Sequence, residues 1–238
     1  MKVYIGTAGW SIPRELASGF PAEGTSLGRY ATRFGATEIN SSFHRPHRLS
    51  TWQRWHDSVP DDFRFSVKLP KVITHERKLA DADDALDGFL VQAHLLADKL
   101  AVLLVQLPPK LPFDEVIAAG FFAGLAKRTA AAVVCEPRHP SWFTPAADAV
   151  LEGSKVARVA ADPAICAGAG SPGGWSGLNY WRLHGSPIVY RSSYADRIGD
   201  YAAKLRAQAA CQTWCIFDNT ASSAGAGDAL ELIHSLEA

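Results

Sequence analysis

Short apolar segments alternate with helix-like segments along the whole chain, and this alternation constrains the fold more than any other feature. The apolar segments span residues 3–5, 36–39, 63–69, 100–107, 131–135, 156–161, 180–183 and 213–217. Helical periodicity or capping signals lie at 27–34, 49–55, 83–97, 114–127, 146–152, 194–210 and 228–236. Consecutive parallel strands need a long crossover connection, which the helices supply. We therefore expect parallel strands with helices packed outside them.

The number of strand–helix units favours one architecture. Eight predicted strands, all but one followed by a helix-like segment, match a TIM-type (β/α)8 barrel in a chain of this length. An open doubly wound sheet is the alternative, but no G-x-G-x-x-G follows the first apolar segment, so no dinucleotide fingerprint supports it. No linker or break in composition divides the 238 residues. The sequence predicts a single α/β domain, a TIM barrel of parallel strands, across residues 1–238.

Net charge and composition indicate where the protein resides more clearly than what it does. The formal net charge is zero, so the chain lacks the broad basic field of non-specific nucleic-acid binding, although a local basic pocket stays compatible with it. None of the four cysteines forms C-x-x-C. The N-terminus lacks the apolar segment of a signal peptide, and no apolar run reaches the roughly 18 residues of a membrane span. We expect a cytoplasmic protein with no membrane association.

Ionisable residues follow the predicted strands. The segment 131–143, A-A-V-V-C-E-P-R-H-P-S-W-F, starts as a buried strand and ends in Glu136, Arg138 and His139. In a TIM barrel the carboxyl ends of all strands face one mouth. Because side chains alternate along a strand, the polar set of each segment shares one face, which we expect to point inward. The predicted mouth contains Glu38, Asn40, Lys68, Gln106, Glu136, Arg138, His139, Asp162, Arg182, His184 and Asp218, with His44, Thr74, His75 and Asn219 on adjoining loops.

These residue types support three kinds of chemistry. The acid–base candidates are Glu136, His184 and Asp218, because histidine titrates near neutral pH and crowding shifts the pKa of carboxylates. Substrate-binding candidates include Arg138 and Arg182, whose planar forks fit phosphate or carboxylate. The full set of predicted substrate-binding residues is Glu38, Asn40, Lys68, His75, Gln106, Arg138, Arg182 and Asn219. A structural ion-pair network without chemistry is the competing interpretation of the same charges.

Cofactors and rim features stay open at this level. Carboxylates and histidines of the mouth could hold a divalent metal in a mixed oxygen and nitrogen shell, but no H-x-H or H-E-x-x-H occurs. The Gly- and Ser-rich segment 221–230 could bind phosphate at the start of the last helix, or be a loop capped by Asp228. Aromatic residues near the mouth could stack on a sugar or base, or only cover apolar surface; they are Trp10, Phe43, Trp142, Trp175 and Tyr190.

Several motifs together resemble a known family. They are G-T-A-G-W-S at 6–11, A-T-E-I-N-S-S-F at 36–43, F-R-F-S-V-K-L-P-K-V-I-T-H at 63–75, V-L-L-V-Q-L-P-P at 102–109, E-P-R-H-P-S-W-F at 136–143, Y-W-R-L-H-G at 180–185 and F-D-N-T at 217–220. On these motifs the chain resembles the YecE-like family, known as domain of unknown function 72. The resemblance implies a TIM barrel and no established reaction. Two departures stand out: Pro137 replaces a usual Phe, and Asp218 replaces a usual Asn and adds a carboxylate.

The leading functional hypothesis is a hydrolase or lyase that acts on a small anionic substrate containing phosphate or sugar. In it, Glu136 and His184 transfer protons, while Lys68, Arg138 and Arg182 hold the anion. One alternative is a nucleic-acid-binding barrel resembling apurinic-site endonucleases, with aromatic side chains stacked on bases. Another is a ligand-binding barrel without catalysis. The sequence leaves the substrate, the metal and the oligomeric state open.

Overall fold

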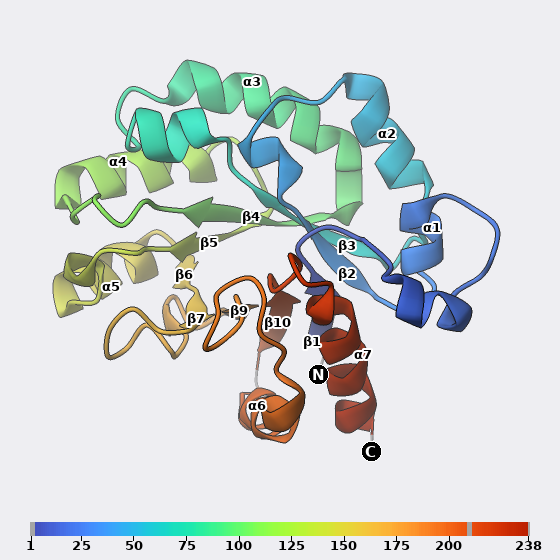
Figure 1. Cartoon of the computed structure of the whole chain (residues 1–238). Coiled ribbons are helices and arrows are strands. Elements are labelled where there is room, and N and C mark those ends of the chain that lie inside the picture. Colours follow the sequence, from blue (N-terminus) through green and yellow to red (C-terminus); the bar gives the residue numbers. More distant parts are fainter. Residues whose placement is uncertain (1–2, 209–210, 238) are drawn as a thin grey trace.

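The structure is a computed structural model that describes residues 3–208 and 211–237. Strands lie at the centre, with helices outside them (Figure 1). The strands are β1 (Val3–Thr7), β2 (Ala36–Ile39), β3 (Arg64–Lys68), β4 (Leu100–Gln106), β5 (Ala132–Glu136), β6 (Val156–Arg158), β7 (Ala160–Asp162), β8 (Gly173–Gly174), β9 (Leu178–Leu183) and β10 (Gln212–Phe217). The α-helices are α1 (Ser26–Tyr30), α2 (Leu49–Asp57), α3 (Asp83–Ala93), α4 (Glu115–Ala126), α5 (Pro145–Gly153), α6 (Ile198–Ala207) and α7 (Ala224–Glu237).

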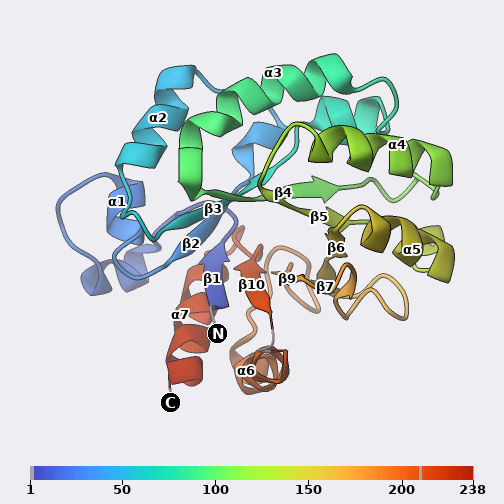
Figure 2. The ribbon, with the colours of Figure 1, turned by 180° about the vertical axis from the view of Figure 1, so that it is seen from behind.

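The predicted single closed barrel of eight parallel strands is wrong. The strands form two sheets, one ordered β1-β10-β9-β7 and one ordered β2-β3-β4-β5-β6-β8. The first sheet is parallel throughout, whereas β8 pairs antiparallel with β6 in the second. Helices α1 to α5 lie along the six-stranded sheet, and α6 and α7 lie beside the four-stranded sheet (Figures 1 and 2). The protein therefore has a mixed α/β fold with two sheets.

Two local features separate the sheets. The apolar segment predicted as one strand over 156–161 is divided at Val159, so that β6 joins one sheet and β7 joins the other. At the opposite edge, a single bridge between Ala8 and Glu38 takes the place of a ladder between β1 and β2. The two strands still approach closely, because a Cβ on Gly6 would lie 2.1 Å from the Ala36 carbonyl oxygen. The apolar pattern of the sequence predicts neither the division at Val159 nor the missing ladder between β1 and β2.

Most other predicted elements are confirmed to within a few residues. Asp114 caps α4 as expected, because its carboxylate accepts a bond from Ile117 N at 3.0 Å. Helix α7 begins at Ala224, four residues before the predicted start, so Asp228 lies inside the helix and is not its cap. The helix predicted over 194–210 corresponds to η6 (Ala195–Arg197) and α6; positions 209–210 lie outside the described residues.

Alternation along the strands divides the core into two layers. One face of both sheets contributes to a shared interior cluster, to which Tyr180, Trp214 and Val134 belong. The opposite face packs under the helices in a larger cluster that includes Val67 and Cys215. Arg182, two residues beyond Tyr180, shares its inward direction. This arrangement aims the polar ends of the strands at the interior. None of the described helices is long and apolar enough to cross a membrane.

Candidate functional site

Arg182 of β9 is the centre of a buried charge cluster at the carboxyl ends of the strands. Its Nε and Nη2 donate to the two oxygens of Glu38 at 3.0 and 2.8 Å. Its Nη1 donates to Glu136 Oε2 at 2.5 Å, and its Nη2 also donates to Asp218 Oδ2 at 2.9 Å. The Arg182 side chain is 0% exposed, so one guanidinium holds carboxylates from β2, β5 and the end of β10.

His184 closes the other side of the cluster. Its Nδ1 lies 2.9 Å from Asp218 Oδ2, and its Nε2 lies 3.1 Å from Glu136 Oε1. Burial alone would lower the pKa of His184, but Glu136 and the hydrogen bond to Asp218 raise it above its usual value. Both ring nitrogens face carboxylate oxygens, which are acceptors only, so the geometry fits an imidazolium that donates from both.

The carboxylates of the cluster are held ionised. Burial alone would raise the pKa of Glu136, but Arg182 and His184 hold it well below its usual range. The pKa of Asp218 is lowered in the same way, with Arg182 and His184 again outweighing burial. Arg138 donates to Glu136 Oε1 from Nε and Nη2 at 3.0 and 2.9 Å. Strong anions with this many donors are weak proton acceptors.

Lys68 differs from the other charged residues of the cluster because no carboxylate of the cluster is left to balance its charge. The carboxylates of Glu38, Glu136 and Asp218 are matched by the cations Arg182, Arg138 and protonated His184. Lys68, the last residue of β3, is an additional cation on the edge of this neutral set. Its charge interacts with those of Arg182, Glu38, Glu136 and Asp218. The site therefore carries one more positive charge than its own carboxylates neutralise.

The amine of Lys68 is unusually placed. Across residues 3–208 and 211–237, no carboxylate lies within 4.0 Å of its Nζ. The Nζ instead lies 4.1 Å from the centroid of the Phe43 ring, and the residue is 8% exposed. Burial, followed by repulsion from Arg182, lowers the pKa of Lys68 to about 8.

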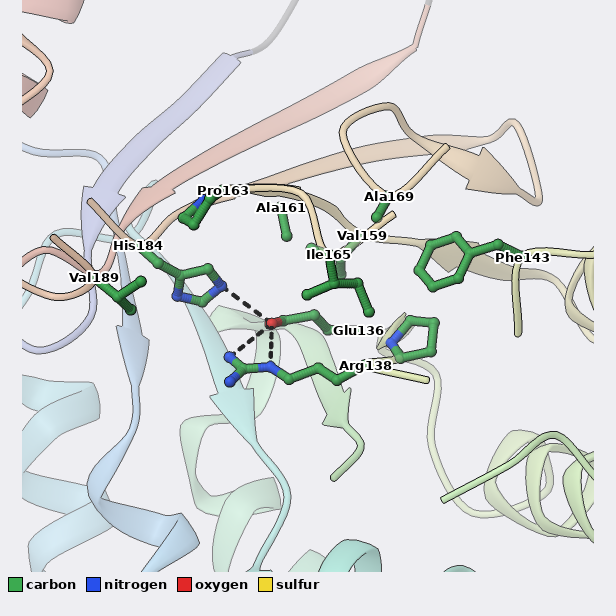
Figure 3. Close-up of a pocket in the computed structure, with 11 residues that line it drawn as sticks. Glu136, Arg138, Phe143, Val159, Ala161, Pro163, Ile165, Ala169, His184 and Val189 are labelled. Carbon is green, nitrogen blue, oxygen red and sulfur yellow. Dashed lines mark hydrogen bonds and ion pairs between the residues drawn. The ribbon is translucent and has the colours of Figure 1, made fainter. Parts of the chain in front are cut away.

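A small pocket opens beside the cluster. Its volume is about 110 Å³, and Glu136, Arg138 and His184 supply its polar side. In Figure 3, dashed lines join one Glu136 oxygen to both Arg138 and His184, next to the apolar side chains of the pocket. The apolar lining residues are Pro137, Phe143, Val159, Ala161, Pro163, Ile165, Ala169 and Val189. Since sites for drug-sized molecules measure roughly 300–1,000 Å³, this pocket is sized for a very small ligand or for one group of a larger one.

The other predicted substrate-binding residues lie at the strand ends but outside the cluster. Gln106 Nε2 donates to the Leu107 carbonyl at 2.8 Å, and the Asn219 amide donates to Ser192 O and Asp228 Oδ2. Asn40 follows β2, and its buried Oδ1 has no hydrogen-bond partner among the described residues. His75 pairs with Thr74 at 2.9 Å. Burial and the positive charges of Lys68 and Arg138 lower the pKa of His75, so the ring lies within electrostatic range of both cations.

Two residues predicted at the mouth, His139 and Asp162, have structural partners elsewhere, and so does Asp228 of the predicted phosphate segment. His139 accepts from Ser141 N and caps η5 (Pro140–Trp142). Asp162 binds the hydroxyls of Tyr194 and Tyr201. Asp228 accepts from Ser193, Tyr194 and Asn219, which ties α7 to neighbouring loops. No group of three or more metal-ligand side chains is arranged to hold an ion within the part of the chain that the structure describes.

Sequence reasoning missed two parts of the site. Tyr180 donates to Glu38 Oε2 at 3.1 Å and accepts from Ser66 Oγ at 2.8 Å, and so supports the carboxylate that Arg182 holds. The alternation pattern placed Tyr180 inward but gave it no partner. The apolar walls formed by Ile165 and Val189 come from loops. Their only signal in the sequence is that both are apolar residues in segments otherwise rich in Gly, Ala, Ser and Pro.

Fold and site together define an α/β protein with a buried ion cluster at its strand ends. The model of the family described as "Protein of unknown function DUF72" matches residues 4–238, so the chain belongs to this family. This confirms the resemblance to YecE-like proteins. UPF0759 protein YecE of Escherichia coli K12 is 32% identical over 141 residues, which cover 59% of this chain and 50% of that relative.

Further relatives agree with this assignment. UPF0759 protein YunF of Bacillus subtilis strain 168 is 27% identical over 151 residues, covering 60% of this chain and 53% of that protein. The chain therefore spans about half the length of the curated relatives it matches. A DUF72 family crystal structure from Enterococcus faecalis V583 has a TM-score of 0.83 at 18% identity and covers 100% of this chain and 96% of its own. One from Thermotoga maritima MSB8 has a TM-score of 0.79 at 20% identity, with 100% of both chains covered. These two structures share the fold.

Proposed function

We propose that the protein is an enzyme, a hydrolase or a lyase, that acts on a small anionic substrate containing phosphate or sugar. The substrate binds at the carboxyl ends of the strands, beside the charge cluster. The observation that carries this proposal is the Lys68 cation, which no carboxylate of the cluster contacts directly. Because a buried charge is costly unless it is paired or wetted, an anionic ligand is the natural partner for this amine.

Charge placement supports specific roles within the site. Arg138 is about a quarter exposed and lines the pocket, so it can face a ligand while it holds Glu136. Arg182 is fully buried and already engaged with three carboxylates, so we assign it a positioning role. In this proposal Lys68 and Arg138 attract the anion, and Arg182 fixes the carboxylates around it.

Proton transfer is assigned by access and by pKa. Glu136 and His184 both line the pocket, so they can reach a ligand there. We propose that His184, protonated by its two carboxylate neighbours, acts as an acid and Glu136 orients it. Asp218 contacts His184 from the other side and completes the unit. Since the site draws residues from β2 to β10, we also propose that residues 1–238 function as one domain.

Binding of inorganic phosphate tests the anion site directly. We expect wild-type protein to bind phosphate at pH 7, and Lys68→Met to weaken binding roughly 10- to 100-fold, the value of a charge-assisted hydrogen bond. Lys127→Met is the matched control, because this exposed lysine ends α4 far from the strand carboxyl ends. Equal phosphate affinity for the wild type and Lys68→Met would refute the assignment.

A substrate screen tests catalysis. Phosphate esters and glycosides are offered to wild type and to Glu136→Gln, a variant that keeps the shape of the side chain. We expect Glu136→Gln to remain folded by circular dichroism and to lose any turnover that the wild type shows. A folded variant with undiminished turnover would remove Glu136 from the mechanism, and failure of the variant to fold would make the residue structural.

A further inference from the structure

The environment of Lys68 differs from that of the other deeply buried lysine. Lys99 is 3% exposed, and its Nζ donates to the carbonyl oxygens of His56 and Val59 at 2.9 and 2.8 Å. Lys68 has comparable burial, but its Nζ lies over the face of the Phe43 ring at 4.1 Å from the centroid. Phe43 comes from η2 (Ser41–Phe43), which also fixes β3 because Ser42 Oγ donates to the Lys68 carbonyl at 2.7 Å.

Such an amine has the features of a nucleophile. A lysine becomes nucleophilic when an apolar contact and neighbouring cations favour its neutral form. Burial of Lys68, which is 8% exposed, disfavours the charged amine, and Arg182 supplies the cation that opposes protonation most strongly; together they outweigh the attraction of the Phe43 ring face for the charged form. The titratable and charged groups that influence the amine are Glu38, His75, Glu136, Arg182 and Asp218. With a pKa of about 8, roughly a tenth of Lys68 is unprotonated at pH 7, against less than about one part in a thousand for an ordinary lysine.

We propose that Lys68 Nζ forms an imine with the carbonyl group of a small anionic aldehyde or ketone, while Arg138 contacts the anionic group of that substrate. This inference rests on the proposed function and deepens it, because it names a carbonyl substrate and favours a lyase over a hydrolase. Lys68 then acts as the reacting group, and the positive charge beside it recruits the substrate.

The step balances without any further reactant. The neutral amine attacks the carbonyl carbon, and a proton moves from nitrogen to the former carbonyl oxygen to give a carbinolamine. Loss of that oxygen as water, after protonation, leaves a protonated imine. His184 is the acid that the proposed function already places beside the pocket. A bond on the carbon next to the iminium carbon can then break: its electron pair forms the carbon–carbon double bond of an enamine, and the other fragment leaves without that pair, for example a carboxylate group as carbon dioxide. Such cleavage is the chemistry of a lyase.

Borohydride trapping on the 238-residue chain tests the imine. The probes are glyoxylate and dihydroxyacetone phosphate, each incubated at pH 7 with sodium borohydride and followed by peptide mapping. A reduced imine becomes a stable secondary amine on the lysine concerned. We expect labelling of Lys68 on the order of 100-fold faster than that of Lys127, because of the larger fraction of free amine. Lys99 serves as the buried control and should stay unlabelled.

The outcomes separate this inference from the proposed function. Adducts confined to exposed lysines, or none with either probe, overturn the imine. If phosphate still binds in that case and Lys68→Met weakens it, the anion site stands and only the imine falls. If there is neither a Lys68 adduct nor phosphate binding, both the imine and the anion site are rejected. A Lys68 adduct that excess phosphate suppresses supports both, and this readout requires no variant to fold.

Discussion

Replacing Arg182 with Met removes the cation that three buried carboxylates share. The four hydrogen bonds of Arg182 reach Glu38, Glu136 and Asp218, none of which is more than 8% exposed. Breaking a buried ion pair by removing one partner costs about 3–5 kcal/mol. With three partners left behind, we expect the free energy of unfolding to fall by about 4–5 kcal/mol at pH 7.5. For a chain of this size, that lowers Tm by roughly 8–20 °C.

The loss of stability in Arg182→Met should depend on pH. In the wild type, the lowered pKa values of Glu136 and Asp218 stabilise the fold above the unfolded values near 4, and this stability is lost as pH falls through the folded values. Without Arg182, these carboxylates take up protons more readily. The deficit of Arg182→Met relative to wild type should therefore shrink between pH 7.5 and pH 5.

Urea denaturation followed by circular dichroism at the two pH values measures the deficit. Arg128→Met is the control, since its guanidinium pairs with Asp87 on the surface and should matter little. If Arg182→Met does not fold, Arg182→Lys keeps the charge but not the fork and should show a smaller loss. A deficit below about 1 kcal/mol, or one that grows toward pH 5, would refute the account of a carboxylate cluster held by one guanidinium.

Three further predictions follow from the same geometry. Tyr180→Phe removes the hydroxyl that donates to Glu38 and accepts from Ser66, so thermal denaturation should show a loss of about 1–3 kcal/mol; an unchanged Tm would contradict this. The folded pKa of Lys68 lies below its unfolded value of 10.5, so stability should rise between about pH 8 and 10.5, and urea titrations of Lys68→Met should lack this rise. The raised pKa of His184 stabilises the fold below pH 6.5 and is lost as pH rises through the folded value; His184→Gln should flatten this decline, and a variant that declines as the wild type does would count against the pairing.

The strand ends of the site were predictable because local patterns encode them. Glu136 and His184 each follow an apolar run, and period-two alternation gives the direction of each side chain. The pairing between them was not predictable. Arg182 meets Glu38 across 144 positions and Asp218 across 36, and no local signal specifies which carboxylate meets which cation. The lack of a carboxylate partner for Lys68 depends on that pairing, so it can be recognised only in the structure.

The error in the fold has the same origin. An apolar run shows that residues form a strand, but hydrogen-bond partners decide which sheet it joins. The division at Val159 and the single bridge at Ala8 are both choices between partners distant in the sequence. Asp228 is a local example of a position that tertiary contacts decide and the sequence pattern does not. It resembles a cap in sequence, yet tertiary bonds to Tyr194 and Asn219 hold it within α7.

Every carboxylate of the cluster has a cation, and we propose that Lys68 is left for an anionic ligand. An NMR titration of the Lys68 side chain, assigned by its loss in Lys68→Met, measures this directly. We expect a midpoint near pH 8 that moves upward when phosphate is added. A midpoint near the ordinary lysine value of about 10.4, unmoved by phosphate, would contradict the account.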